Sequence, residues 1–373
     1  MKNKRGVSQL VIFFLIVFFT LSTSQHILAA TLESHKATEI SKDEPDEESL
    51  EIGKLIVEHI TDAYEWHIFS IGKLHLTLPL PAILFDQGHW LCFSSSHLHH
   101  KHAIYKGYFI AENGMNQGKI VRKDDGGKEV RPQLDISITR TVFALFINAF
   151  IVVFLFLFIA KSYRKREGLA PTGAQSMMEP LVLFIRDDVA RSSIGEKNYE
   201  KYTPFLLSLF FFIFLNNLLG IIPFFPWGIS VTGNIAVTGV MAVFVFAITT
   251  YSGNKHYWKD IFNTPGVPWW LKFPIPLMPI VEVMGLFTKP IVLMIRLFAN
   301  MIAGHTVILG FVALIFIFGK MSMGLGYGVS IVSVSFSIFL DLLEILVALI
   351  QAYVFTLLAA LYFGMATEVS EHH

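Results

Sequence analysis

Arg296 stands inside a strongly apolar segment, residues 290–305, whose other side chains belong in lipid. A charged side chain at the centre of a membrane costs roughly 2.5 to 3.5 kcal/mol on insertion scales, so it indicates a functional site. Arginine also keeps its proton when buried, because its pKa lies above about 12, whereas a buried lysine can lose its charge. The sequence therefore predicts a permanent positive charge in the membrane, with an ionised carboxylate as its counterpart.

Further polar residues recur on the same segment at helical spacing. Glu282, Lys289 and Arg296 follow one another every seven residues, and Asn300 comes one turn after Arg296. These four residues are expected to share one stripe of a helix. His305, nine residues after Arg296, is rotated by about 180° at 100° per residue, so it is expected to face a different neighbour. Lys289 either belongs to this pathway or extends to the membrane interface or to Glu282.

A second apolar segment supplies Asp341, Glu344 and Gln351 on one face, at spacings of three and seven residues. Histidine titrates near neutral pH, the pKa of a partly buried carboxyl group can rise toward that range, and asparagine or glutamine can order water between them. The two segments are thus predicted to handle protons. A purely structural His305–Glu344 ion pair is the alternative, but a buried titratable pair is costly unless water reaches it. For Asn216 and Asn217, hydrogen bonds between helices are favoured over a pathway role.

The composition defines the class of protein. The chain has 373 residues, 53% of them hydrophobic, a mean hydropathy of +0.56 and a formal net charge of +0. Such apolarity indicates an integral membrane protein, and a zero net charge argues against nucleic-acid binding. The single cysteine, Cys92, excludes an internal disulfide and a CxxC metal site. No HExxH, GxSxG or phosphate-loop motif is present, so neither ATP binding, a cofactor nor a metal is expected in this chain.

The N-terminal third is predicted to be exported. Residues 1–30 combine basic residues, an apolar run over 11–21 and a small pair at 29–30, as in a signal peptide; an uncleaved membrane anchor is the alternative. Residues 31–135 are expected to form a small α+β domain with a helix at 50–60, a strand at 74–78 and hairpins formed by 105–110 and 119–122. Histidines at 97, 99, 100 and 102 favour a polar loop over a metal site.

Residues 136–373 are predicted to form a membrane domain. Residues 141–160 make a first span, and the basic residues 161–166 place its end in the cytoplasm. An amphipathic helix at 175–189 is expected on the cytoplasmic surface, followed by spans at 204–222 and 235–251. The 44-residue run 276–319 would measure about 66 Å as a helix, roughly twice the thickness of the bilayer core, and 328–365 is similarly long. Both are expected to be single, oblique helices.

The stretch Lys289-Pro-Ile-Val-Leu-Met-Ile-Arg-Leu-Phe-Ala-Asn-Met-Ile-Ala-Gly304 closely resembles the signature of subunit a of F-type ATP synthases. The segment 216–223 is similar to the end of that family's second span, and Glu344 with 351–355 is similar to its last helix. The resemblance covers about residues 138–368. It implies an all-α polytopic membrane protein with two long, strongly tilted helices, here joined to the exported α+β domain.

The resemblance also implies a mechanism and a set of partners. In that family the arginine faces the mid-membrane carboxylates of a c-subunit ring, forces them to deprotonate and separates two half-channels. Arg296 would be that barrier and Glu282 would lie near the cytoplasmic exit; the outer half-channel would be lined by Asn300, His305, Glu344 and Gln351. The partners would be the c ring, the b-subunit stator stalk, the soluble ATPase head and membrane lipid. The expected location is the bacterial inner membrane, with a periplasmic N-terminal domain and a cytoplasmic C-terminus.

Two departures from the family pattern stand out. Many bacterial relatives place Glu at the position of His305 and His at that of Glu344, so the pair is exchanged here. The exported domain is also longer than the usual N-terminal tail, and contact with other stator parts is its expected role. A stand-alone cation channel or secondary transporter would also need intramembrane charges, but transporters tend to show internal repeats, and none is found.

Overall fold

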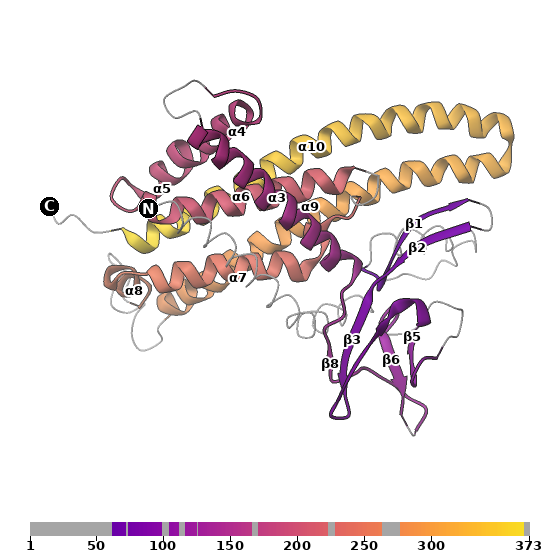
Figure 1. Cartoon of the computed structure of the whole chain (residues 1–373). Coiled ribbons are helices and arrows are strands. Elements are labelled where there is room, and N and C mark those ends of the chain that lie inside the picture. Colours follow the sequence, from indigo (N-terminus) through magenta and orange to yellow (C-terminus); the bar gives the residue numbers. More distant parts are fainter. Residues whose placement is uncertain are drawn as a thin grey trace.

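The computed structural model describes residues 62–71, 74–98, 104–111, 116–124, 126–165, 171–222, 228–262 and 277–368. The predicted signal peptide, the helix at 50–60 and the histidines at 99, 100 and 102 lie outside these residues. The described chain divides into a β-rich N-terminal part and a helical part (Figure 1).

Three small antiparallel sheets form the N-terminal part. β1 (Glu65–Ile71) pairs with β2 (Leu74–Pro79), which confirms the predicted strand at 74–78. β3 (Pro81–Asp86) lies between β4 (His89–Ser94) and β8 (Leu134–Asp135), and β6 (Ile120–Lys123) lies between β5 (Tyr108–Ile110) and β7 (Glu129–Val130). The antiparallel pairing of β5 with β6 confirms the predicted hairpin between residues 105–110 and 119–122. The β3–β4 turn places Gln87 at φ 51° and Gly88 at φ 81°, as a two-residue turn with both central residues left-handed requires.

A buried carboxylate connects two of these sheets. Asp86, at the end of β3, is 3% exposed and accepts hydrogen bonds from the Tyr108 hydroxyl at 2.8 Å and from the Arg122 Nε at 2.7 Å. Burial alone would raise the pKa of Asp86, but the hydrogen bonds from Tyr108 and Arg122 outweigh it and lower that pKa. Burial and the same carboxylate raise the pKa of Tyr108 to about 12. The charge is therefore held ionised inside the domain.

The N-terminal part packs on the start of α3 (Arg140–Lys165). The backbone N–H of Thr141 donates to the Asp62 carboxylate at 3.0 Å, which satisfies one of the free donors at a helix N-terminus. The Trp66 ring meets the Phe143 ring edge-on, with centroids 5.7 Å apart. The β-rich part is thus anchored to the first membrane helix.

Among the described residues, five helices are long and apolar enough to cross a membrane: α3, α6 (Tyr199–Ile221), α7 (Ile235–Ser252), α9 (Leu277–Met321) and α10 (Met323–Thr367). This confirms a polytopic membrane protein. α6 begins before the predicted residue 204, because hydropathy marks only the lipid-embedded part of a helix. Short elements connect the spans: α4 (Ala174–Leu183), the π-helix η2 (Phe184–Arg191), α5 (Ser192–Ile194), η3 (Val231–Gly233) and α8 (Lys255–Phe262).

The predicted amphipathic helix at 175–189 is helical throughout, but it includes the wider turns of η2. Its buried residues Ile185, Val189 and Ala190 belong to the same hydrophobic core as α6 and α10. The apolar face of this segment therefore packs against the membrane helices of the chain. The prediction had considered only contact with the membrane surface.

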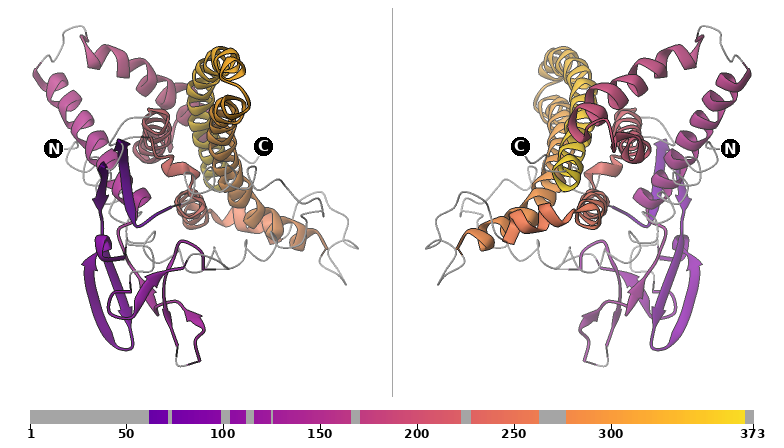
Figure 2. Two further views of the ribbon diagram at one scale, coloured as in Figure 1. Left: turned by 90° about the vertical axis from the view of Figure 1, so that its right-hand side faces the viewer. Right: turned by 90° about the vertical axis from the view of Figure 1, so that its left-hand side faces the viewer.

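α9 and α10 are each 45 residues long, about 68 Å at 1.5 Å per residue. This confirms two single, overlong helices, and they form an antiparallel pair (Figures 1 and 2) whose hairpin end extends beyond the other helices (Figure 1). Only Ser322 separates them. The predicted start of the second helix at 328 is wrong, because the glycine-rich residues before it are helical. A Cβ at Gly326 would lie 2.7 Å from the Gly319 Cα, so glycine permits this tight turn.

Candidate functional site

The structure brings His305 of α9 and Glu344 of α10 together. The His305 Nδ1 lies 3.5 Å from the Glu344 Oε1, and the two side chains are 23% and 5% exposed. Neither carboxylate oxygen of Glu344 accepts a hydrogen bond from any described residue. Buried carboxylates are normally hydrogen-bonded to protein or water, so this site calls for an ordered water or a shared proton.

Gly304 makes room for this carboxylate. A Cβ added at Gly304 would lie 2.8 Å from the Glu344 Oε1 and 3.1 Å from its carboxyl carbon. Real Cβ atoms do not approach oxygen that closely, so any larger residue would displace Glu344. The glycine next to His305 is therefore part of the geometry of the pair.

A second polar contact joins the same two helices. The Asn300 Nδ2 donates a hydrogen bond of 2.9 Å to the Gln351 Oε1, and Gln351 is 5% exposed. His305 thus contacts α10 while Arg296 is exposed, so His305 faces a different neighbour from Arg296, as expected. Asn300 departs from the expected stripe, because it also contacts α10.

Arg296 lies on the open side of α9. Its side chain is exposed, and so are the adjacent apolar residues Val292 and Ile295. In the most apolar window of α9 only 6% of the residues are buried within the chain, against 56% for α6. α9 therefore presents a largely uncovered apolar surface with one fixed positive charge in it.

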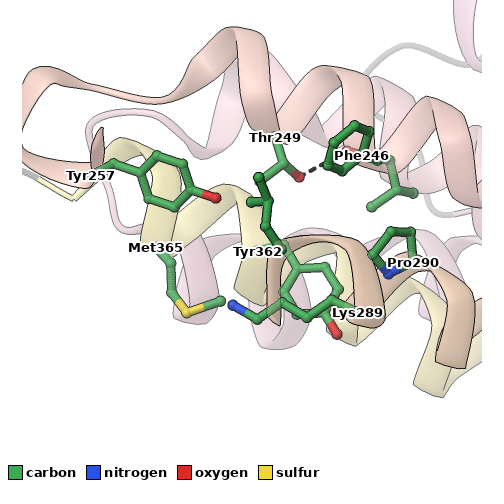
Figure 3. Close-up of a pocket in the computed structure, with 9 residues that line it drawn as sticks. Phe246, Thr249, Tyr257, Lys289, Pro290, Tyr362 and Met365 are labelled. Atoms are coloured by element: carbon green, nitrogen blue, oxygen red, sulfur yellow. Dashed lines mark hydrogen bonds between the residues drawn. The ribbon is translucent and has the colours of Figure 1, made fainter. Parts of the chain in front are cut away.

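Glu282 and Lys289 lie toward the N-terminal end of α9, and Lys289 lines a small cavity there (Figure 3). Val245, Phe246 and Thr249 of α7, Tyr257 of α8, Leu286, Lys289 and Pro290 of α9, and Tyr362 and Met365 of α10 line the cavity. The Lys289 Nζ lies 5.4 Å from the centroid of the Tyr362 ring, within the range of a cation–π contact. Burial and the negative charge of Glu282 raise the pKa of Tyr257. The sequence pattern did not predict Tyr257 and Tyr362, because they come from helices whose spacing does not relate them to α9.

The paired asparagines of α6 form hydrogen bonds between elements, as predicted. The Asn148 Nδ2 of α3 donates to the Asn216 Oδ1 at 2.9 Å. The Thr232 hydroxyl of η3 donates to the Asn217 Oδ1. Both asparagines are fully buried, so they hold α3, α6 and η3 together inside the apolar region.

The fold and the site define a polytopic membrane protein that carries titratable and permanently charged side chains along two long helices. A family model described as ATP synthase A chain matches residues 142–364. Because this match covers more than half of the sequence, the chain belongs to the ATP synthase A chain family. A second model, for a domain of unknown function, matches residues 55–141.

Comparison with individual proteins agrees. The chain is 43% identical over 245 residues to ATP synthase subunit a of Chloroherpeton thalassium, which covers 64% of this chain and 69% of that protein. It is 48% identical over 238 residues to ATP synthase subunit a 2 of Chlorobium luteolum, which covers 63% of this chain and 66% of that protein. It is 42% identical over 246 residues to ATP synthase subunit a of Myxococcus xanthus, covering 64% and 76%. A stand-alone channel or transporter is therefore disfavoured.

Proposed function

We propose that Arg296, in the proton-translocating stator subunit of an F-type ATP synthase, is the fixed charge that separates two half-channels. The uncovered surface of α9 carries this proposal, because the guanidinium lies among exposed apolar side chains that require a partner or lipid. A ring of c subunits, each with a carboxyl group in mid-membrane, is that partner.

Electrostatics defines what Arg296 does to the ring. A nearby positive charge favours the ionised form of a carboxyl group, so a c-subunit carboxyl releases its proton as it approaches Arg296. The guanidinium does not give up its own proton at any accessible pH, so it does not act as a stepping stone for protons. Ion flow across the membrane is thereby coupled to rotation of the ring.

The outer half-channel is assigned to Asn300, His305, Glu344 and Gln351. His305 and Glu344 are close enough to exchange a proton through one water or after a small side-chain movement. The Asn300–Gln351 hydrogen bond lies between this pair and Arg296 along both helices, so its amides order water there. Protons pass from Glu344 and His305 toward the ring carboxylate.

The inner half-channel is assigned to the region of Glu282. Glu282 is half-buried and lies near Tyr257, at the end of α9 that packs on α8. Its carboxylate accepts protons leaving the ring and passes them to water. Lys289 holds the wall of this exit through its contact with Tyr362.

The arrangement in the cell follows from the basic loops. Residues 161–166 and 255–259 place those connections in the cytoplasm. The domain of residues 31–135 is then periplasmic after removal of a signal peptide, the C-terminus is cytoplasmic, and the bacterial inner membrane holds residues 136–373. The periplasmic domain contacts other parts of the stator.

The native Cys92 tests this topology, because it is an exposed free thiol. A membrane-impermeant maleimide added to sealed cells should label Cys92. With Cys92→Ser as background, a cysteine at the exposed Lys197 should react only after the cells are opened. Labelling of both positions from one side would contradict the topology.

Copurification tests the assembly. An affinity tag on this chain should recover a c ring, a b-subunit stalk and a soluble head with ATPase activity from detergent extracts. Recovery of the chain alone, under conditions in which the rest of the complex remains intact, would overturn the proposed function.

A further inference from the structure

The face of α10 that turns toward α9 is polar from the hairpin end to the candidate site. Ser330, Ser333, Ser337, Asp341 and Glu344 follow one another at spacings of three or four residues. At 100° per residue these five positions fall within an arc of about 80°. They form one continuous line, the α10 polar line, which begins near the start of α10 at its hairpin with α9.

Burial follows this line. Ser333 and Glu344 are buried and Asp341 is half-buried, while neighbours on other faces such as Ile331 are exposed. The Ser337 hydroxyl and both oxygens of Glu344 are buried and have no hydrogen-bond partner among the described residues. Several groups on this face therefore have unused hydrogen-bonding capacity in an apolar region.

Between Thr306 and the hairpin end, α9 brings no matching polar groups to the opposite side. Every residue of α9 from 307 to 319 is apolar or glycine, and Phe311 stacks on Phe336 with centroids 5.0 Å apart. The ionisable groups near Asp341 on these two helices are Glu344, one turn along α10, and His305 of α9. Lys320, the next ionisable residue on α9, lies at the hairpin end.

Close helix packing explains only part of this pattern. Small residues such as serine let two membrane helices approach each other, and Gly319 with Gly326 serves that purpose at the turn. A carboxylate is neither small nor uncharged, and an ionisable residue inside a membrane segment is costly. Close packing therefore does not account for Asp341, nor for the buried carboxyl group of Glu344 one turn away, which accepts no hydrogen bond from a described residue.

We infer that Asp341 is a further proton-relay residue of the outer half-channel, which receives protons from water along Ser333 and Ser337 and passes them to Glu344. This inference rests on the proposed function. A hydronium ion in the line of water protonates the Asp341 carboxylate and leaves as water. The proton then moves to the carboxylate of Glu344, directly or through one water, and Asp341 returns to its ionised form.

The test uses the whole complex in liposomes, with ATP synthesis driven by an imposed membrane potential and pH difference. Asp341→Asn keeps the shape of the side chain, but its amide group cannot take up and release a proton as a carboxyl group does. The rate of ATP synthesis should therefore fall about tenfold when the proton-entry side is near neutral pH. The deficit should shrink as that side is acidified at constant total driving force, because direct protonation of Glu344 then becomes faster.

Asp341→Glu should keep at least about half of the wild-type rate of ATP synthesis. Ser335→Ala is the matched control and should have no effect, since Ser335 is exposed and bonds only to the Ile331 carbonyl of its own helix.

A wild-type rate for Asp341→Asn, or a deficit that does not change with pH on the entry side, would overturn the inference. Arg296→Ala in the same liposomes separates the two proposals. If the Arg296→Ala complex is active, the proposed function is wrong. If the Arg296→Ala complex is inactive and the Asp341→Asn complex is as active as wild type, only the inference about Asp341 is wrong.

A second measurement tests the water path even if the complex with Asp341→Asn fails to assemble. In a Cys92→Ser background, Ser337→Cys should react with a small cationic methanethiosulfonate added from the outer side, and the modification should slow synthesis. Ser335→Cys, which faces away from the line, should not react because its thiol does not ionise in lipid. An unreactive Ser337→Cys in an assembled complex would contradict the water path.

Discussion

The Nδ1 atom of His305 lies 3.5 Å from the Oε1 atom of Glu344, so α9 and α10 meet through a titratable pair inside an apolar region. An apolar pair of similar size would pack at lower cost. A titratable pair at this place therefore indicates a chemical role, which fits two residues that pass protons.

The first prediction concerns the order of this pair. His305→Glu alone places two carboxyl groups together, and Glu344→His alone places two imidazoles together, so each single change should slow ATP-driven pumping at least about tenfold. The double exchange restores one acid and one imidazole and should recover a good part of the lost activity. A double-mutant cycle on pumping rates measures this coupling. Effects that add without recovery would show that the two residues act separately.

The second prediction concerns Gly304. In Gly304→Ala the new methyl group would lie 2.8 Å from the Glu344 Oε1, so the carboxyl group must move away from His305 and pumping should fall several-fold, as misplacement by about 1 Å can cost up to 10²-fold. Gly310→Ala is the matched control on the same helix, because a Cβ there meets nothing within 4 Å. Equal activity of the two variants would show that the position of Glu344 does not limit transport.

The third prediction concerns the buried carboxylate of the N-terminal domain. Asp86→Asn removes the charge that Tyr108 and Arg122 bind and should destabilise the domain by about 2 kcal/mol. Asp124→Asn is the control, since Asp124 is 56% exposed and lies 3.7 Å from the same arginine; its effect should stay below about 0.5 kcal/mol. Limited proteolysis of the domain in the intact complex would measure both.

The same carboxylate sets a pH dependence. The pKa of Asp86 is lowered in the folded domain, so its contribution to stability is fully present above the unfolded value of about 3.9 and is lost as pH falls through the lower, folded value. The difference in proteolysis between wild type and Asp86→Asn should thus be constant above about pH 5 and shrink below about pH 4. A difference that grew on acidification would contradict the assigned charge state.

The sequence identified the parts of this molecule that depend on local spacing. Alternation predicted β2, unbroken apolar runs predicted the length of α9 and α10, and the seven-residue spacing placed Glu282, Lys289 and Arg296 on one helix. The cost of a charge in lipid singled out Arg296 without any structure.

Local spacing does not predict contacts between segments that lie far apart in the sequence. The approach of Tyr257 to Glu282 and of Lys289 to Tyr362 depends on how α8 and α10 pack on α9. The hydrogen bond from Asn300 to Gln351 was not predicted either, because the spacing of Asn300 from Arg296 had placed both residues on one stripe. The glycine-rich start of α10 was missed since helix propensity is low there, while the tight turn at Gly326 requires it.

ATP-driven proton pumping by Arg296 variants in sealed membrane vesicles tests whether this guanidinium is the fixed charge that separates the two half-channels. Arg296→Ala should leave the complex assembled, because the side chain is exposed, but should abolish pumping. Arg296→Lys should fail nearly as completely, since an ammonium group lacks the planar donor array and can lose its proton in lipid. Pumping near the wild-type rate by either variant would contradict the account.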